Sequence, residues 1–174
     1  SVPYFWGTLG IVYNDKFVKP GAIKTWNDLW SKKYRRQILL VDSARDAMGM
    51  ALVSLGYSMN TTSSIKLQLA QTKLNSLGPN IKAIISDEMK MYLVQNEAAI
   101  GVTWSGEAYE MMEQNPHLHY VVPKQGSNLW FDNFVIPKTV QNKKAALKFI
   151  NFMLEPKNAA QNAEYVGYAT PNTA

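Results

Sequence analysis

Short apolar runs alternate with amphipathic stretches along most of the chain. Three of the runs predict strands, at 38–41, 82–85 and 98–103, because they are dominated by aliphatic side chains, and the wholly apolar run at 38–41 predicts a strand covered on both faces. Each run leads into a stretch in which apolar residues recur at helical spacing. The alternation predicts an α/β fold in which helices flank a mostly parallel sheet.

The same pattern predicts the remaining elements. Helices are expected at 43–55, 63–77, 143–154 and 158–166. Two more helices are expected, one from Ser86–Asp87 to about 95 and one from Trp104–Gly106 to about 114. Strands are expected at 7–13 and 119–122. Asp42 is expected to cap the helix at 43–55.

Polar and apolar residues alternate along 127–137, which predicts an extended strand. Residues two apart on a strand point to the same side, so Trp130 and Asp132 share a face. An indole beside a carboxylate suits an organic cation, which contacts the ring and pairs with the charge. The same two residues also fit a packed core tryptophan next to an aspartate that caps a turn.

Ligands of parallel α/β sheets bind beyond the carboxyl ends of the strands. Polar and aromatic residues of this chain follow three predicted strands at that edge, namely Asp42, Ser43, Asp46, Ser86, Asp87 and Trp104. Asp42 and Asp87 also fit helix N-caps. Asp46 also fits stabilisation of the helix dipole in the first turn.

Composition narrows the class of protein. The 174 residues are 47% hydrophobic, enough for one well-buried domain. The chain shows neither an apolar run of membrane-spanning length nor a signal peptide at its first residues. It has no cysteine, which excludes disulfides and thiolate metal sites. The net charge is +5, but basic residues cluster only at 32–36, so no nucleic-acid binding is predicted.

Several segments, in one consistent order, match a known family: 1–7, 25–30, 40–46, 55–62, 104–106, 129–132, 150–154 and 167–172. In these segments the sequence resembles the spermidine/putrescine-binding protein of bacterial polyamine ABC importers. The resemblance implies a lobe of a type II solute-binding protein, with the first lobe otherwise absent from this sequence. Residues 1–6 would then be a crossover strand, 7–132 the second α/β lobe, and 133–174 a crossover with helices that return to the first lobe.

The resemblance also implies a function. The parent protein would bind spermidine or putrescine in the periplasm or at the cell surface, deliver it to membrane permease subunits, use no cofactor or metal, and not be an enzyme. The implied binding residues are Trp104, Trp130, Asp132, Asp46, Ser43 and Tyr168. The tryptophans would flank the ligand, the aspartates would pair with its ammonium groups, and Ser43 and Tyr168 would add polar or ring contacts. Members of the family often have an acid where this chain has Ser43, which leaves the choice of polyamine open.

Other functions are compatible with the same residues. A ligand-sensing domain of a transcription regulator has a similar two-lobe plan, and another small cation or solute would fit similar chemistry. His117 and His119 have the H-x-H spacing of metal ligands, but they equally fit two exposed rings. Helices at 143–166 without a covering lobe would expose an apolar stripe including Leu147, Ile150 and Phe152, so this chain is expected to self-associate.

Overall fold

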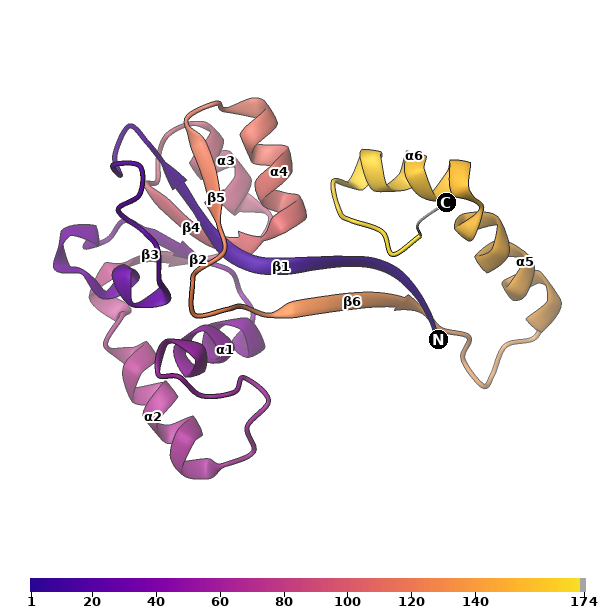
Figure 1. Ribbon diagram of the computed structural model, residues 1–174, viewed down its shortest axis with the longest axis horizontal. Helices are drawn as coiled ribbons and strands as arrows, with labels where there is room; N and C mark the ends of the chain where they lie inside the picture. The colour runs from indigo at the N-terminus through magenta and orange to yellow at the C-terminus, as the bar shows by residue number, and fades with distance from the viewer. Residues whose placement is uncertain (173–174) are drawn as a thin grey trace. The chain divides into compact units, whose positions relative to one another are not determined.

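The computed structural model describes residues 1–172, which form two compact units. The larger unit is Thr8–Asn128, and the smaller consists of Ser1–Gly7 together with Leu129–Ala174. Strand β1 (Val2–Asn14) contributes residues to both (Figure 1). Within residues 1–172 no helix is both long and apolar enough to cross a membrane.

The larger unit is built on a mixed sheet with strand order β3-β2-β4-β1-β5. Its other strands are β2 (Ile38–Leu40), β3 (Ile81–Ile84), β4 (Ile100–Trp104) and β5 (Leu118–Val121). Strand β2 runs parallel to β3 and β4, whereas β1 is antiparallel to β4 and β5. Strands β2, β3, β4 and β5 therefore point the same way, which confirms the predicted α/β class with a mostly parallel sheet.

Helices cover both faces of this sheet (Figure 1). Helix α1 (Ala44–Ser54) packs with α2 (Ser64–Asn75), and α3 (Glu88–Val94) packs with α4 (Ser105–Gln114). Short 3-10 turns at Trp26–Trp30, Lys32–Tyr34 and Gly78–Asn80 complete the unit. All three residues of β2 are buried, as expected of a strand covered on both faces.

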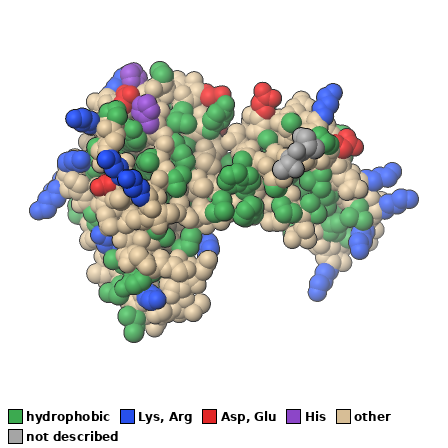
Figure 2. All heavy atoms as spheres, in the orientation of Figure 1, with side chains coloured by type: hydrophobic (Ala, Val, Ile, Leu, Met, Phe, Trp, Pro, Cys, Tyr) green, Lys and Arg blue, Asp and Glu red, His purple; other side chains and the backbone are tan. Residues whose placement is uncertain are grey.

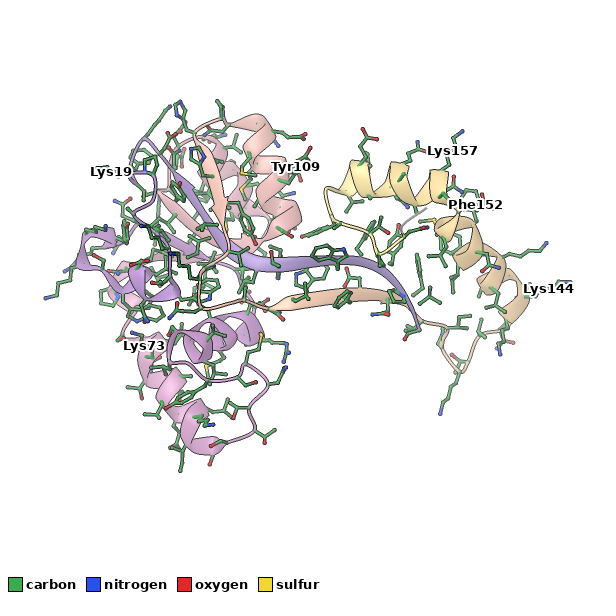
Figure 3. The ribbon with its side chains drawn as sticks, in the orientation of Figure 1. Lys19, Lys73, Tyr109, Lys144, Phe152 and Lys157 are labelled. Carbon is green, nitrogen blue, oxygen red and sulfur yellow. The ribbon has the colours of Figure 1, made fainter. Side chains whose placement is uncertain are left out.

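Tertiary contacts join the segments that flank the sheet to its core. Trp26 is almost fully buried, and its indole N–H donates to the carbonyl of Gly126 at 2.9 Å. The indole of Trp30 donates to the carbonyl of Lys73 at 2.9 Å, while the Lys73 ammonium lies 4.4 Å from that ring; Figure 3 labels Lys73. The segment before β2 is thus anchored to the loop before β6 and to the end of α2.

The start of α1 differs from the predicted start. Ser43, not Asp42, is the N-cap, because its hydroxyl oxygen accepts the backbone N–H of Asp46 at 3.3 Å. Asp42 is exposed. Asp87 occupies the cap position of α3 but makes no side-chain cap hydrogen bond. The expectation that Asp42 caps this helix was therefore wrong, and Ser43 has a structural role of its own.

The smaller unit contains β6 (Leu129–Phe134), α5 (Lys143–Leu154) and α6 (Pro156–Val166). Strand β6 pairs with β1. After α6, the N–H of Trp6 donates to the carbonyl of Ala169 at 2.8 Å, and the Thr170 hydroxyl donates to the carbonyl of Tyr4 at 3.1 Å. The segment after α6 is therefore tied to the first residues of the chain.

Helix α5 has an inward face and an exposed face. Ile150 is only 7% exposed, so its predicted place in an exposed apolar stripe was wrong. Leu147 and Phe152 are exposed by 46% and 54%, as predicted, and Phe149 is exposed by 56%; Figure 3 labels Phe152. Helical spacing places positions 149 and 152, which are three residues apart, on one face, and position 150 does not belong to that face.

Candidate binding site

Asp46 lies at the centre of a polar cluster in the larger unit. It belongs to the first turn of α1, directly after β2, and is only 5% exposed. One carboxylate oxygen, Oδ2, accepts the indole N–H of Trp104 at 3.2 Å. The other, Oδ1, accepts the side-chain amide of Asn128 at 3.0 Å. The structure thus brings together Asp46 and Trp104, which the sequence placed at one edge, and adds Asn128.

Both donors to Asp46 are neutral. The ion pairs within residues 1–172 join Lys90 to two glutamates and Asp15 to two histidines, and Asp46 takes part in none. The neighbouring Arg45 donates to Asn60 at 2.9 Å instead. A carboxylate has about four lone-pair positions, and these hydrogen bonds occupy two of them. When ionised, Asp46 therefore keeps an unneutralised charge and spare acceptor capacity beside an indole ring.

Ser43 lies at the same helix start and is half-buried. Its oxygen is engaged as the N-cap, which leaves its O–H proton available to donate. Asp42 and Ser43 also line a mostly apolar groove of about 710 Å³ together with residues such as Leu74 and Ile84. Neither Asp46 nor Trp104 lines that groove.

Trp130, Asp132 and Tyr168 belong to the smaller unit. The rings of Trp130 and Tyr168 meet edge to face, with centroids 5.0 Å apart. Asp132 is exposed, and no hydrogen bond or ion pair of its carboxylate occurs within residues 1–172. The Trp130 indole N–H is buried without a hydrogen-bond partner in that same range. This N–H does not itself indicate a cation site, because an ammonium group is also a donor.

The six predicted binding residues therefore form two groups. Ser43, Asp46 and Trp104 lie on the larger unit, and Trp130, Asp132 and Tyr168 on the smaller. Ser86 and Asp87, also predicted at the edge, are exposed after β3. No hydrogen bond between their side chains and Asp46 occurs in the described part of the chain.

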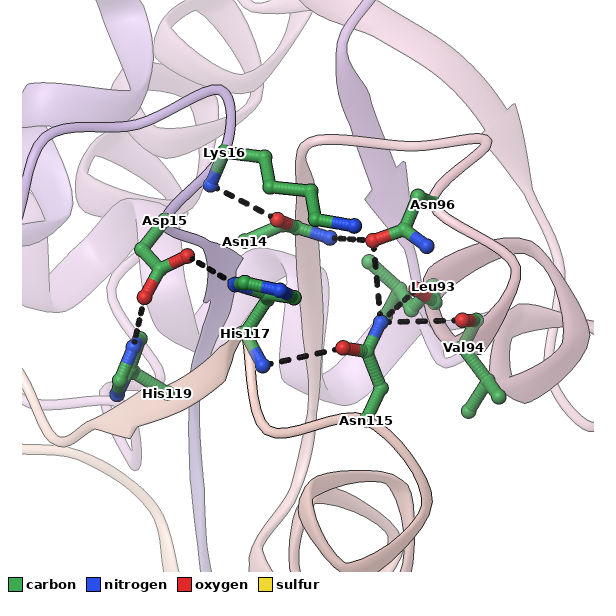
Figure 4. Close-up of polar contacts among 9 residues, drawn as sticks. All are labelled: Asn14, Asp15, Lys16, Leu93, Val94, Asn96, Asn115, His117 and His119. Carbon is green, nitrogen blue, oxygen red and sulfur yellow. Dashed lines mark hydrogen bonds and ion pairs between the residues drawn. The ribbon is translucent and has the colours of Figure 1, made fainter.

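The two histidines form a separate cluster on the surface (Figure 2). His117 Nδ1 and His119 Nε2 each lie 2.8 Å from a different oxygen of Asp15 (Figure 4). Hydrogen bonding to His119, and then to His117, lowers the pKa of Asp15. Tyr13 pairs with Ile100 while Leu9 pairs with Trp104, so this cluster lies at the opposite edge of the sheet from Trp104. Residues 1–172 contain no group of three histidines or acids arranged to hold a metal ion.

Asn128 was not predicted as a site residue. It directly precedes the Leu129–Asp132 segment that carried the resemblance, but asparagine is common in loops for local hydrogen bonding. Its contact with Asp46 joins residues 82 positions apart, and no periodicity within either segment signals it.

This fold is a mixed sheet flanked by helices, with one strand shared by two compact units and polar residues at the strand ends. It is the architecture expected of one lobe of a type II solute-binding protein. Comparison with known proteins agrees with this class. The chain belongs to the bacterial extracellular solute-binding protein family, whose model matches residues 1–174.

Relatives within the family have more specific names. The chain is 41% identical over 174 residues to a spermidine/putrescine-binding periplasmic protein of Salmonella typhimurium, a match that covers all of this chain and 50% of the relative. It is 40% identical to the protein of the same name in Escherichia coli. The chain thus spans about half the length of the curated relatives it matches.

Solved structures extend the similarity to the fold. The substrate-binding protein PotD of a spermidine/putrescine ABC transporter from Streptococcus pneumoniae is 59% identical with a TM-score of 0.87; the match covers 99% of this chain and 53% of that one. A Listeria monocytogenes protein assigned to a spermidine/putrescine ABC transporter is 57% identical with a TM-score of 0.94, over 99% and 53% of the two chains.

Proposed function

We propose that the protein to which this chain belongs is the solute-binding component of a polyamine ABC importer. It captures spermidine or putrescine outside the cytoplasm, in the periplasm or at the cell surface, and delivers it to membrane permease subunits. It is a binding protein and not an enzyme. The observation that carries the proposal is the buried Asp46 carboxylate, which has only neutral donors and adjoins the Trp104 indole. The names of the relatives support the same ligand class.

The chemistry of Asp46 fits a primary ammonium group. An isolated buried charge is costly unless it is paired, and a ligand cation supplies the missing partner. The Trp104 ring adds an aromatic surface for the cation and for the methylene groups beside it, at about 0.5–2 kcal/mol. Arginine or lysine as the donor to Asp46 would have neutralised the carboxylate and competed with the ligand.

We assign Trp130, Asp132 and Tyr168 to the same function. Trp130 and Tyr168 form an aromatic pair, and Asp132 lies two residues beyond Trp130 on the same strand face. An ammonium group that reaches Asp132 would therefore lie near an aromatic surface as well. Ser43 completes the assignment as a neutral hydrogen-bonding residue.

We further propose that residues 7–132 are the second lobe of the parent protein and that residues 133–174 return to a first lobe. The exposed side chains of Phe149 and Phe152 support this assignment, because they share one face of α5 and apolar side chains that cluster on a surface usually meet a partner. In the full-length protein the first lobe would cover them.

Calorimetry of the full-length protein tests the function. It is titrated with spermidine, putrescine and the uncharged diol 1,4-butanediol, which has the carbon chain of putrescine without its ammonium groups. The proposal expects binding of at least one polyamine with a dissociation constant in the micromolar range or below, and no binding of the diol. Equal affinity for the diol, or no binding of either polyamine, contradicts it.

A further inference from the structure

Asn128 is fixed to the sheet by its backbone. Its carbonyl accepts the N–H of Leu9 at 3.1 Å, and the hydroxyl of the preceding Ser127 donates to the Leu9 carbonyl. Leu9 is also the residue of β1 that lies opposite Trp104 of β4. Asn128 and Trp104 therefore stand on either side of one β1 residue, and both side chains reach the carboxylate of Asp46.

We infer that Asn128 is a positioning residue, which holds the Asp46 carboxylate in the orientation that receives the ligand's ammonium group. This inference rests on the proposed function and assigns one of its residues. A carboxylate that accepts one N–H on each oxygen cannot rotate without losing a hydrogen bond. It is therefore ordered before the ligand arrives, and the cost of ordering it is not subtracted from the binding free energy.

The type of donor supports this role. An amide orients the carboxylate without cancelling its charge, whereas a lysine or arginine would do both. Within residues 1–172 the Asn128 side-chain amide donates to Asp46 and to no other residue. The hydrogen bonds that secure the loop to β1 come instead from the Asn128 carbonyl and the Ser127 hydroxyl.

This division of roles provides a matched control. Asn128→Leu removes the amide donor, keeps a side chain of similar shape and leaves the backbone bond to Leu9. Ser127→Ala removes one of the two hydrogen bonds between the loop and β1 but leaves the amide. A merely structural role for Asn128 predicts similar effects of the two variants. A positioning role predicts that only N128L changes ligand binding.

The test uses the full-length protein and calorimetry with the polyamine that the wild type binds more tightly. We expect N128L to lower the affinity about tenfold, the scale of one hydrogen bond to a charged group, and S127A to change it less than twofold. In a D46N background, N128L should have little further effect, since its action passes through the carboxylate. If N128L fails to fold by thermal melting, Asn128→Ala replaces it.

A second readout does not depend on ligand affinity. The indole N–H signal of Trp104 in an NMR spectrum, assigned with W104F, should move in N128L and stay in place in S127A. The inference is overturned if N128L binds the polyamine with wild-type affinity, or if S127A loses as much affinity as N128L. It is also overturned if N128L lowers the affinity as much in the D46N background as in the wild type. If the wild-type protein binds no polyamine, the proposed function is refuted instead. The shift of the Trp104 indole signal in N128L then tests by itself whether Asn128 positions the Asp46 carboxylate.

Discussion

Trp104 and Asp46 are joined by a hydrogen bond of 3.2 Å from the indole N–H to the carboxylate, although 58 positions separate them in the sequence. The contact links the end of β4 to the first turn of α1. The orientation of the aromatic ring and that of the acid therefore depend on each other.

This dependence predicts non-additive mutations. Asp46→Asn removes the charge and weakens the hydrogen bond, while Trp104→Phe keeps an aromatic ring but loses the N–H. Each should weaken polyamine binding, and the double variant should lose at least about 0.5 kcal/mol less than the sum, because the two residues share one contact. Calorimetry of the four proteins in the full-length background measures the coupling. Strict additivity would show that the contact does not matter for binding.

Strand β6 offers a second test of the assigned binding residues. Trp130→Ala and Asp132→Asn should each reduce polyamine affinity by about 1–3 kcal/mol, the scale of a lost aromatic contact or charged hydrogen bond. Phe131→Ala is the matched control, since Phe131 is exposed on the alternate face of the same strand. If F131A weakens binding as much as the other two, strand stability rather than ligand contact accounts for the losses.

Ser43 is predicted to influence the choice of polyamine. Ser43→Asp adds a carboxylate, and aspartate caps a helix about as well as serine, so α1 should remain intact. We expect affinity for the triamine spermidine to rise more than affinity for the diamine putrescine. Ser43→Ala controls for the cap and should lower the free energy of unfolding by about 1 kcal/mol. An equal gain for both ligands would exclude a role in reading chain length.

Tyr120 predicts a pH dependence of stability. Burial raises the pKa of Tyr120 to about 12 from 10.0, against a smaller lowering by its hydrogen bond with Thr8. Its folded-state pKa exceeds the unfolded one, so this contribution is fully present below pH 10.0 and is lost as the pH rises toward 12. The loss corresponds to about 2–3 kcal/mol.

Denaturant unfolding at pH 9 and pH 11.5 checks the effect in wild type and in Tyr120→Phe. The wild type should lose more stability between the two pH values than the variant. Parallel losses in both proteins would assign the alkaline effect to other groups.

The tight packing of the Tyr120 ring is also testable. A Cβ added at Gly10 would lie 2.3 Å from Tyr120 Cζ, so Gly10→Ala should destabilise the fold.

The exposed side chains of α5 predict self-association of the 174-residue chain. Phe149 and Phe152 lie three residues apart on one face of α5 and are more than half exposed, so they offer an apolar surface that a second copy can cover. Light scattering should report a mass above that of the monomer, and Phe149→Lys with Phe152→Lys should restore the monomer. Tyr109→Lys on α4, an exposed aromatic of the larger unit, serves as the control. A monomeric wild-type chain would remove this support for a covering lobe.

Local sequence patterns determined much of the secondary structure. Helix α5 occupies Lys143–Leu154, as its apolar spacing predicted, and β2 is the wholly buried strand that its run of aliphatic residues predicted. The alternation around Trp130 likewise predicted β6. These predictions succeed because helix and strand periodicities are properties of neighbouring residues, and because burial follows from which face is apolar.

Tertiary structure decided the rest. The reversed direction of β1 and the inward placement of Ile150 depend on packing against distant segments. The choice of Ser43 as the N-cap depends on the exact residue at which α1 starts. The same holds for the amide of Asn128, which reaches Asp46 across 82 positions of sequence. A hydrogen bond requires donor and acceptor to lie about 3 Å apart, so only the folded backbone determines which distant donor meets a given carboxylate.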